Sequence, residues 1–248
     1  MRKIFISITF ITIGIFLNGL FLTGTSMAVD GVIEVNQARA EAEISSKDFP
    51  GFPVAIFNPG SYVLTSNLNV PKDTDCINIA THNVTLDLNG FTIRGNGGTS
   101  GSGVNSVLQS GTYNRISVHN GVVQNMGKHG VHVGEQSLVK TVHAHGNGGS
   151  GIKADNDSIV ISNTTQGNGN DGIYADNGST TRDNTAQYND DGIYASAGST
   201  VISNTVLYNK GYGIYANTGS TVDGNTANNN DEDGISAYYG CTVKGNTA

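Results

Sequence analysis

The chain has 248 residues, of which 37% are hydrophobic and 34 are glycine, and its net charge at pH 7 is −7. An acidic surface repels nucleic acid and anionic lipid, so this charge excludes a nucleic-acid partner.

The first 28 residues have the pattern of a secretory signal peptide. Arg2 and Lys3 supply the positive start, residues 4–22 are apolar, and Ser26-Met27-Ala28 offers small residues for cleavage. We therefore expect export from a bacterial-type cell to the periplasm, the cell surface or the medium. The length of the apolar run leaves an uncleaved membrane anchor as the alternative. Removing the signal leaves 11 basic residues against 20 acidic ones, a net charge near −9.

Residues 29–61 do not repeat, and we expect them to cap the N-terminal end of the fold. Residues 35–42 are compatible with a short helix, and residues 49–53 contain two prolines and a glycine that break it. A stack of strands needs an atypical segment over its end, because an open sheet edge invites association.

Residues 62–248 are expected to form a solenoid, since a period near 21 residues dominates the second half of the chain. A fixed period indicates one structural unit stacked on copies of itself. Each unit contains short β-branched runs bounded by Gly, Asn and Asp, which is typical of strands and turns. Leu207 is the only leucine between 146 and 248, which excludes a leucine-rich repeat. The period is marked by Gly130, Gly151, Gly172, Gly192, Gly213 and Gly234.

The predicted fold is therefore all-β: a parallel β-helix with one coil per repeat and a rise of about 4.8 Å per coil. Three columns of small residues should fill its narrow core. They are Ile152, Ile173, Ile193, Ile214 and Ile235; Ala154, Ala175, Ala195, Ala216 and Ala237; and Val160, Thr181, Val201, Val222 and Val243.

One asparagine per coil is expected to hold a turn rather than to bind a ligand. Stacked amides can donate to one neighbouring coil and accept from the other, so that such a ladder satisfies itself inside a buried bend. Asn89 and Asn120 should occupy the same place in earlier coils, with Val142 as the exception. The predicted ladder consists of Asn163, Asn184, Asn204, Asn225 and Asn246.

Three further expectations follow from the coil geometry. Cys76 and Cys241 lie about seven coils apart, roughly 30 Å, so they should not form a disulfide. Residues 95–112 are rich in Gly and Ser and should form an excursion before the next coil. The last coil stops at Ala248, so either another molecule closes this end, giving an oligomer, or the chain is a fragment.

The chain resembles exported bacterial right-handed parallel β-helix proteins of the pectate-lyase-like superfamily. The motifs are Pro59-Gly60-Ser61-Tyr62-Val63-Leu64-Thr65, the run at 83–90 and the Gly-Ile-x-x … Asn-Thr repeats, over about residues 54–248. The repeats are also similar to those of the periplasmic copper-site maturation protein of nitrous oxide reductase. The resemblance implies a right-handed coil and a carbohydrate ligand. None of the superfamily's catalytic signatures, such as a paired-Asp or an Asp-Pro-His-Glu motif, is present.

A tyrosine row is the first candidate binding site. Strand alternation sends Tyr174, Tyr194 and Tyr215 outward on one face, with Lys153 and His132 below them and Ser236 above. Regularly spaced aromatic faces can stack on sugar rings. The alternative is that tyrosine is a good strand former that stacks on itself.

A histidine pair is the candidate metal site. His143 and His145 flank inward Ala144, so both point the same way, whereas His132 lies on another strand. No further ligand spacing supports a metal, so we assign no metal, and surface histidines are the alternative.

Acid-rich turns could hold Ca²⁺ or perform acid–base chemistry, but Asp in a turn more often satisfies backbone donors. No cofactor is assigned, with Ca²⁺ as the open alternative. Arg182, Asp183, Asp223 and Lys244 form a mixed outer row, and threonine columns raise the alternative of ice binding. The acidic turn residues are Asp171, Asp190, Asp191, Asp231, Glu232 and Asp233.

The sequence thus predicts an exported β-helix that binds a polysaccharide or cell-surface glycan, or serves as a surface structural module, without an identifiable catalytic site. The alternative is a polysaccharide lyase or epimerase. A compact group of Lys, Arg, His, Tyr or Asp on adjacent coils of one face would favour the enzyme.

Overall fold

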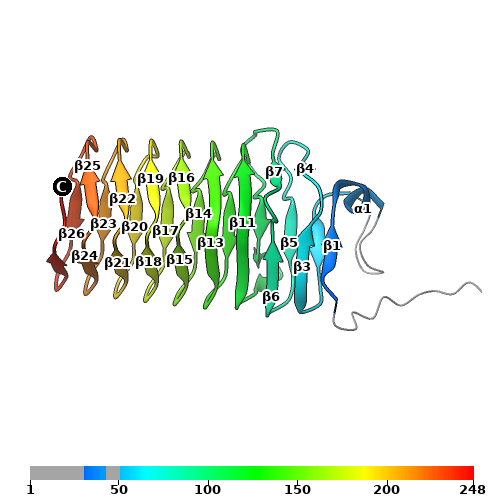
Figure 1. Ribbon diagram of the computed structural model, residues 1–248, viewed down its shortest axis with the longest axis horizontal. Coiled ribbons are helices and arrows are strands. Elements are labelled where there is room, and N and C mark those ends of the chain that lie inside the picture. The colour runs from blue at the N-terminus through cyan, green and yellow to red at the C-terminus, as the bar shows by residue number, and fades with distance from the viewer. Residues whose placement is uncertain (1–30, 43–50) are drawn as a thin grey trace, which may run out of the picture. The chain divides into compact units, whose positions relative to one another are not determined.

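The computed structural model describes residues 31–42 and 51–248, which form a stack of β-coils (Figure 1). The expected signal segment, 1–28, lies outside these residues. Within the described part of the chain, no helix is long and apolar enough to cross a membrane. The strands form two parallel sheets and one antiparallel hairpin, and the coils follow one another from β1 to β27 along the long axis of Figure 1.

Sheet B has nine strands, and each pairs in parallel with the strand one coil further on. Its strands are β2 (Val54–Ile56), β5 (Ile77–Ile79), β8 (Val104–Asn105), β12 (Val131–Val133), β14 (Ile152–Ala154), β17 (Ile173–Ala175), β20 (Ile193–Ala195), β23 (Ile214–Ala216) and β26 (Ile235–Ala237).

Sheet A has 16 strands in two halves. Two long strands, β11 (Ile116–Gln124) and β13 (Leu138–His145), run through both halves. The first half also contains β1 (Ile33–Val35), β3 (Gly60–Leu64), β6 (Val84–Asp87), β15 (Ile159–Ile161), β18 (Thr180–Arg182), β21 (Thr200–Ile202), β24 (Thr221–Asp223) and β27 (Thr242–Lys244). The second half also contains β4 (Leu68–Asn69), β7 (Thr92–Arg94), β16 (Thr164–Gln166), β19 (Thr185–Gln187), β22 (Thr205–Leu207) and β25 (Thr226–Asn228).

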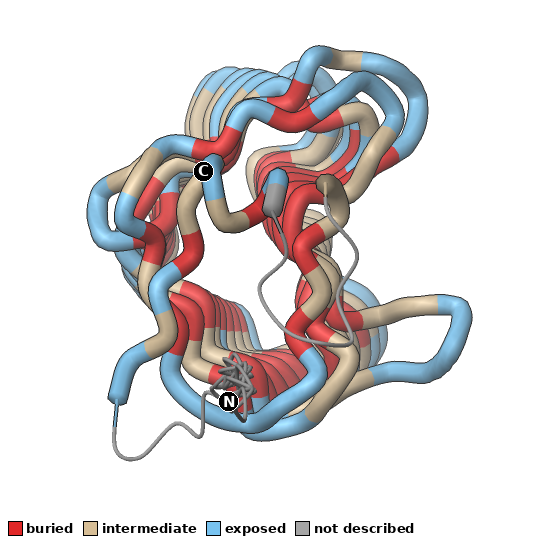
Figure 2. Tube along the Cα trace, turned by 90° about the vertical axis from the view of Figure 1, so that its right-hand side faces the viewer, coloured by how far each residue is buried: buried red, intermediate tan, exposed pale blue. Residues whose placement is uncertain are grey.

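Each C-terminal coil therefore has three faces: sheet B and the two halves of sheet A. Figure 2, which looks along the stack, shows that buried positions recur at the same places in successive coils. The predicted core columns are in register, for example Ile173 with Ile193 and Ala175 with Ala195. Their members are buried except in the last coil, where Ile235 is half-buried and Ala237 and Val243 are exposed. The parallel β-helix predicted from the period is thus the observed fold.

The predicted asparagines lie at the bend between the two halves of sheet A, and their amides form a continuous ladder. In Asn204, Nδ2 donates to Oδ1 of Asn225 at 2.9 Å and to the Thr181 carbonyl at 3.0 Å. Its Oδ1 accepts from both the backbone N and Nδ2 of Asn184, each at 3.0 Å. Because Asn204 is 1% exposed, these bonds replace the water that an exposed amide would bind.

A second asparagine ladder, which the sequence analysis missed, lies at the bend that leads into sheet B. Its Nδ2 atoms donate to the Oδ1 atoms of the next coil at 2.9–3.2 Å. This ladder explains the glycines that mark the repeat: a Cβ on Gly151 would lie 2.7 Å from Nδ2 of Asn168 and 2.8 Å from the Gly172 carbonyl. The ladder consists of Asn147, Asn168, Asn189, Asn209 and Asn230.

Buried serines hold the third bend, between sheet B and the first half of sheet A. Backbone N–H groups donate to the serine Oγ one coil further on, as Ser137 does to Ser158 at 3.1 Å. Cys241 occupies this place in the last coil, where its Sγ lies 3.1 Å from the Asn217 carbonyl. Both cysteines are free, as predicted. The serines of this column are Ser137, Ser158, Ser179, Ser199 and Ser220.

At the N-terminal end, stacked strands begin before residue 62. β1 pairs with β3, and β2 with β5, inside the segment 29–61 that we expected to cap the coil. The helix α1 (Gln37–Ala42) follows Asn36, whose Oδ1 caps it by accepting from the Arg39 backbone at 2.9 Å. Gln37 accepts from the backbone N of Asn69 at 2.9 Å, and Ala40 is fully buried in the core. α1 therefore packs onto the first coils.

Two expectations about residues 89–120 were wrong. The stretch 95–112 is not a single excursion, because β8 lies within it and pairs with β5 and β12. The short hairpin of β9 (Val107–Leu108) and β10 (Gly111–Thr112) follows β8. Asn89 and Asn120 do not extend the first ladder: both have positive φ, and their Nδ2 atoms donate to the Leu64 carbonyl and the Asp87 carboxylate. In the coil that contains Asn120, the ladder position is held by Gly121. Gly121 pairs with Val142, which holds the same position in the next coil.

We predict that Asn204→Ala lowers the free energy of unfolding by about 1–3 kcal/mol, because it leaves buried partners in two neighbouring coils unsatisfied. Asn209→Ala in the second ladder should have a similar effect. Chemical denaturation followed by circular dichroism measures both.

The control is Asn228→Ala, which removes an outward amide from the same sheet and should change stability much less. An equal loss in all three variants would contradict a specific role for the ladders.

Candidate functional site

The outer face of sheet B carries one polar row that runs along eight coils. Strand pairing sets each member beside the next, so neighbours are separated by one coil rise of about 4.8 Å. We call it the sheet B row. It consists of Asn78, Asn105, His132, Lys153, Tyr174, Tyr194, Tyr215 and Ser236.

The three tyrosines of this row stack on one another rather than presenting their faces outward. Ring centroids of Tyr174 and Tyr194 lie 4.9 Å apart with planes 2° apart, and those of Tyr194 and Tyr215 lie 5.0 Å apart at 11°. Lys153 Nζ lies 5.1 Å from the Tyr174 ring centroid and covers its other face. A sugar ring cannot enter between rings at this spacing. Both faces of Tyr174 and Tyr194 are therefore covered, so these two rings offer edges and hydroxyls rather than the ring faces expected from the sequence.

On the N-terminal side of the tyrosines, His132 lies next to Lys153 in the row and close to His129 and Asp155. His132 is 7% exposed and its Nε2 has no hydrogen-bond partner. Oδ1 of Asp155 lies 3.5 Å from this Nε2, which is ion-pair distance for a protonated ring. The His129 ring contacts it edge to face, with centroids 5.2 Å apart. Burial, then the neighbouring His132 and Lys153, lowers the pKa of His129 to about 3. His129 is therefore neutral at physiological pH.

A hydrogen-bonded line joins His129 to Asp171, a half-buried acid in the coil that carries Tyr174. The backbone N of Ser150 donates to Nδ1 of His129 at 3.1 Å, and Oγ of Ser150 donates to Oδ2 of Asp171 at 3.1 Å. Burial raises the pKa of Asp171 to about 6, with Asp191 and Asp190 adding to the rise. His132, Lys153 and Tyr174 thus lie side by side on adjacent coils of one face, with Asp155 next to His132.

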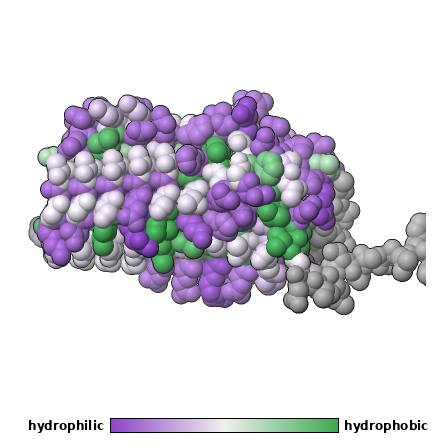
Figure 3. Space-filling model, in the orientation of Figure 1, coloured by the Kyte–Doolittle hydropathy of each residue, from purple (hydrophilic) through white to green (hydrophobic). Residues whose placement is uncertain are grey.

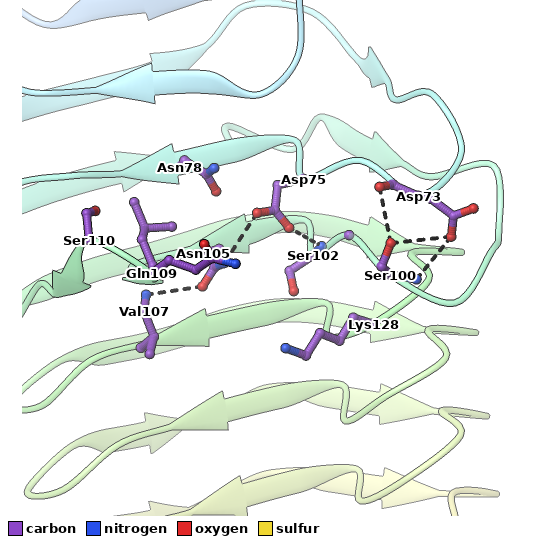
Figure 4. A pocket seen from close by; sticks show the side chains of 12 residues that line it. Asp73, Asp75, Asn78, Ser100, Ser102, Asn105, Val107, Gln109, Ser110 and Lys128 are labelled. Carbon is purple, nitrogen blue, oxygen red and sulfur yellow. Dashed lines mark hydrogen bonds between the residues drawn. The ribbon is translucent and has the colours of Figure 1, made fainter.

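The N-terminal end of the sheet B row opens into a groove with a volume of about 640 Å³. Figure 4 shows its polar side chains between the hairpin that follows β8 and the turns around Asp73 and Ser100. The Asp75 carboxylate accepts from the Ser102 backbone and from Nδ2 of Asn105. Oδ1 of Asn78 is buried without a partner. Sequence reasoning missed this groove, because its residues precede the regular repeats and no motif marks them.

His143 and His145 point outward from β13 on either side of buried Ala144. Between Arg94 and His145 lies Gln124. In the amide orientation that satisfies both neighbours, its nitrogen donates to Nε2 of His145 at 2.9 Å. Among the described residues, no three His, Cys, Asp or Glu side chains converge as metal ligands would.

The remaining predicted rows are in register but remain surface features. Arg182 pairs with Asp183 at 3.0 Å, and Lys244 with Asp223 at 3.4 Å. Asp191 accepts from the Tyr212 backbone at 2.7 Å, as expected for an acid in a turn. Figure 3 shows regular hydrophilic and neutral rows over the C-terminal coils. The two threonine columns are separated by a mixed column that includes Arg182, Ile202 and Asp223, so they do not form one flat hydroxyl surface.

Residues 102–248 match the family described as "Right handed beta helix region". The chain belongs to this family. The right-handed β-helix of residues 102–248 carries the C-terminal part of the groove and the sheet B row from Asn105 onward.

One similar solved structure is the A-module of mannuronan C-5 epimerase AlgE6 from Azotobacter vinelandii. It is 14% identical, the match covers 86% of this chain and 87% of that chain, and the TM-score is 0.41. These values support no conclusion about activity. No curated protein sequence matches the chain.

We predict that Asp171→Asn stabilises the protein at pH 8 by on the order of 1–3 kcal/mol. The folded chain holds the Asp171 proton more tightly than the unfolded chain, so the free energy of unfolding falls as pH rises between about 4 and 6. Asparagine removes this cost and can still accept from Ser150. Thermal unfolding of both proteins at pH 4 and pH 8 measures the difference. A gain of the same size at both pH values would contradict a raised pKa of Asp171 in the folded chain.

Proposed function

We propose that this right-handed β-helix binds a polysaccharide or cell-surface glycan along the sheet B row. The observation that carries this proposal is the row itself: eight side chains able to hydrogen-bond, one per coil, leading into a walled groove. The coil rise of about 4.8 Å is close to the length of one sugar unit in an extended chain, so successive sugars could meet successive side chains.

Unpartnered polar atoms in the row support a ligand. Oδ1 of Asn78 and Nε2 of His132 are both buried without a hydrogen-bond partner, and such atoms are rare because leaving them unpaired is costly. Glycan hydroxyls can both donate and accept. Lys153 would add a cation for a carboxylate on an acidic sugar, although the net charge of −7 disfavours polyanions elsewhere on the surface.

The second candidate function is a polysaccharide lyase or epimerase, and the group around His132 favours it. Both reactions remove a proton next to a carboxylate, which needs a base and a nearby positive charge for the enolate that forms. Lys153 would supply the charge, and His132 or Tyr174 the base. Asp155 lies 3.5 Å from His132 and would orient it.

We further propose that the chain is exported through residues 1–28 and acts in the periplasm or at the cell surface, without a cofactor. The support is the pattern of Arg2, Lys3, the apolar run and the small residues before residue 29. The proposal has two further parts. The repeats are similar to those of the periplasmic copper-site maturation protein of nitrous oxide reductase, and the chain serves as a surface structural module.

A panel of alginate, polygalacturonate, xylan and barley β-glucan tests both candidates in one experiment. We expect retardation in gels that contain at least one of these polysaccharides, and Lys153→Gln should weaken it about 5–50-fold by removing a charged contact in the middle of the row. Incubation with the two polyuronates, followed by ultraviolet absorbance for new carbon–carbon double bonds and by NMR for inverted sugars, reports lyase or epimerase activity.

The matched control is Lys140→Gln, which removes an exposed lysine from β13 on sheet A and should leave retardation unchanged. Equal effects of the two substitutions would place binding elsewhere. A wild-type chain that no polysaccharide retards would overturn the binding proposal, and an unchanged polyuronate would overturn the enzymatic one.

A further inference from the structure

A second pair of tyrosines lies away from the sheet B row, at the turn that follows the second half of sheet A. Tyr188 and Tyr208 are 51% and 48% exposed. Their rings stack with centroids 5.5 Å apart and planes 10° apart. No repeat marks them in the sequence, because the neighbouring coils have Gly or Asn at this place.

Both tyrosines adopt a backbone conformation that their residue type disfavours. The φ angles are 57° at Tyr188 and 56° at Tyr208, in the left-handed region. The same place in neighbouring coils is held by Asn125, Gly146, Gly167 and Asn229, also with positive φ. Glycine and asparagine tolerate this region, whereas a bulky side chain is an outlier there. Glycine or asparagine would adopt this backbone conformation with less strain, so a tyrosine at this turn points to a function for its side chain.

The coil before Tyr188 leaves space at the equivalent place. That coil has Gly167 there, and a Cβ added to Gly167 would meet nothing within 4 Å. Tyr208 covers the ring face on the other side. The pair therefore forms a stiffened platform that exposes one aromatic face beside empty space.

Two outward amides directly precede this turn in adjacent coils. They are Gln166 and Gln187, which are in register. Neither side chain is hydrogen-bonded to another of the described residues. An open aromatic face flanked by free amides is the arrangement that binds a sugar, with C–H groups on the ring and hydroxyls on the amides.

We propose that Tyr188, supported by Tyr208, is a second glycan-binding platform that stacks one pyranose ring of a neutral polysaccharide over Gly167. A neutral sugar fits better than an acidic one, because the exposed Asp190 lies two residues from Tyr188 and the chain is acidic overall. The inference rests on the proposed glycan ligand, but it concerns residues outside the sheet B row. Two separate contacts on one polysaccharide chain would raise the overall affinity without strengthening either one.

The test is Tyr188→Asn, which introduces the residue that the equivalent turns already use. We expect retardation in xylan or barley β-glucan gels to weaken about tenfold, while the midpoint of thermal unfolding stays the same or rises, because asparagine relieves the left-handed φ. Tyr239→Asn removes another exposed tyrosine outside the platform and should change neither readout.

Unchanged retardation of Tyr188→Asn would overturn the platform. A lower unfolding midpoint would also overturn it, since the tyrosine would then serve packing. If Lys153→Gln weakens binding and Tyr188→Asn does not, the platform fails and the sheet B row stands. The reverse result supports the platform and overturns the row. If neither xylan nor barley β-glucan retards the wild-type chain, the platform is overturned. If alginate or polygalacturonate alone retards it, the result still supports glycan binding by the sheet B row.

Discussion

The fold depends on side-chain amides that hydrogen-bond from coil to coil inside its bends. A narrow coil must turn three times per repeat, and each turn buries backbone groups that strand pairing does not satisfy. The asparagine ladders solve this at two bends. After the first member of each ladder, each Oδ1 accepts from a backbone N–H and a side-chain amide of the preceding coil, while each Nδ2 donates to a carbonyl. Because every coil must present the same amide at the same height, the ladders fix the repeat length within one residue.

This constraint also determines what the surface can do. Once each coil has the same length, every outward position becomes a row with a spacing of one coil rise. Rows arise for structural reasons, so a row alone is weak support for a function. The sheet B row differs because it contains buried unpartnered atoms at Asn78 and His132 and joins a walled groove. Tyr188 differs because its backbone is strained where other coils use Gly or Asn.

The period was enough to predict the coil, the core columns and the free cysteines, because stacking forces identical residues into register. The first asparagine ladder was predictable for the same reason. The second ladder, from Asn147 to Asn230, repeats with the same period and was equally predictable. The predictions failed where the repeat is irregular: Asn89 and Asn120 lie off the ladder position, and β8 lies within the Gly/Ser-rich stretch. It also could not show that the faces of Tyr174 and Tyr194 cover each other, since ring orientation depends on side-chain packing rather than on register. The groove at Asp75 and the burial of Asp171 depend on loops and neighbours that no motif encodes.

Native-state hydrogen exchange at the ladder positions tests the central claim most directly. The backbone N–H groups of Asn184 and Asn204 lie in bends, yet they donate to the Oδ1 atoms of Asn204 and Asn225 at 3.0 and 2.9 Å. If the ladders hold the coils together, these amides should exchange only on the large-scale opening that also exposes strand amides such as that of Ile193. Exchange at the rate of an exposed turn, while Ile193 stays protected, would contradict the account.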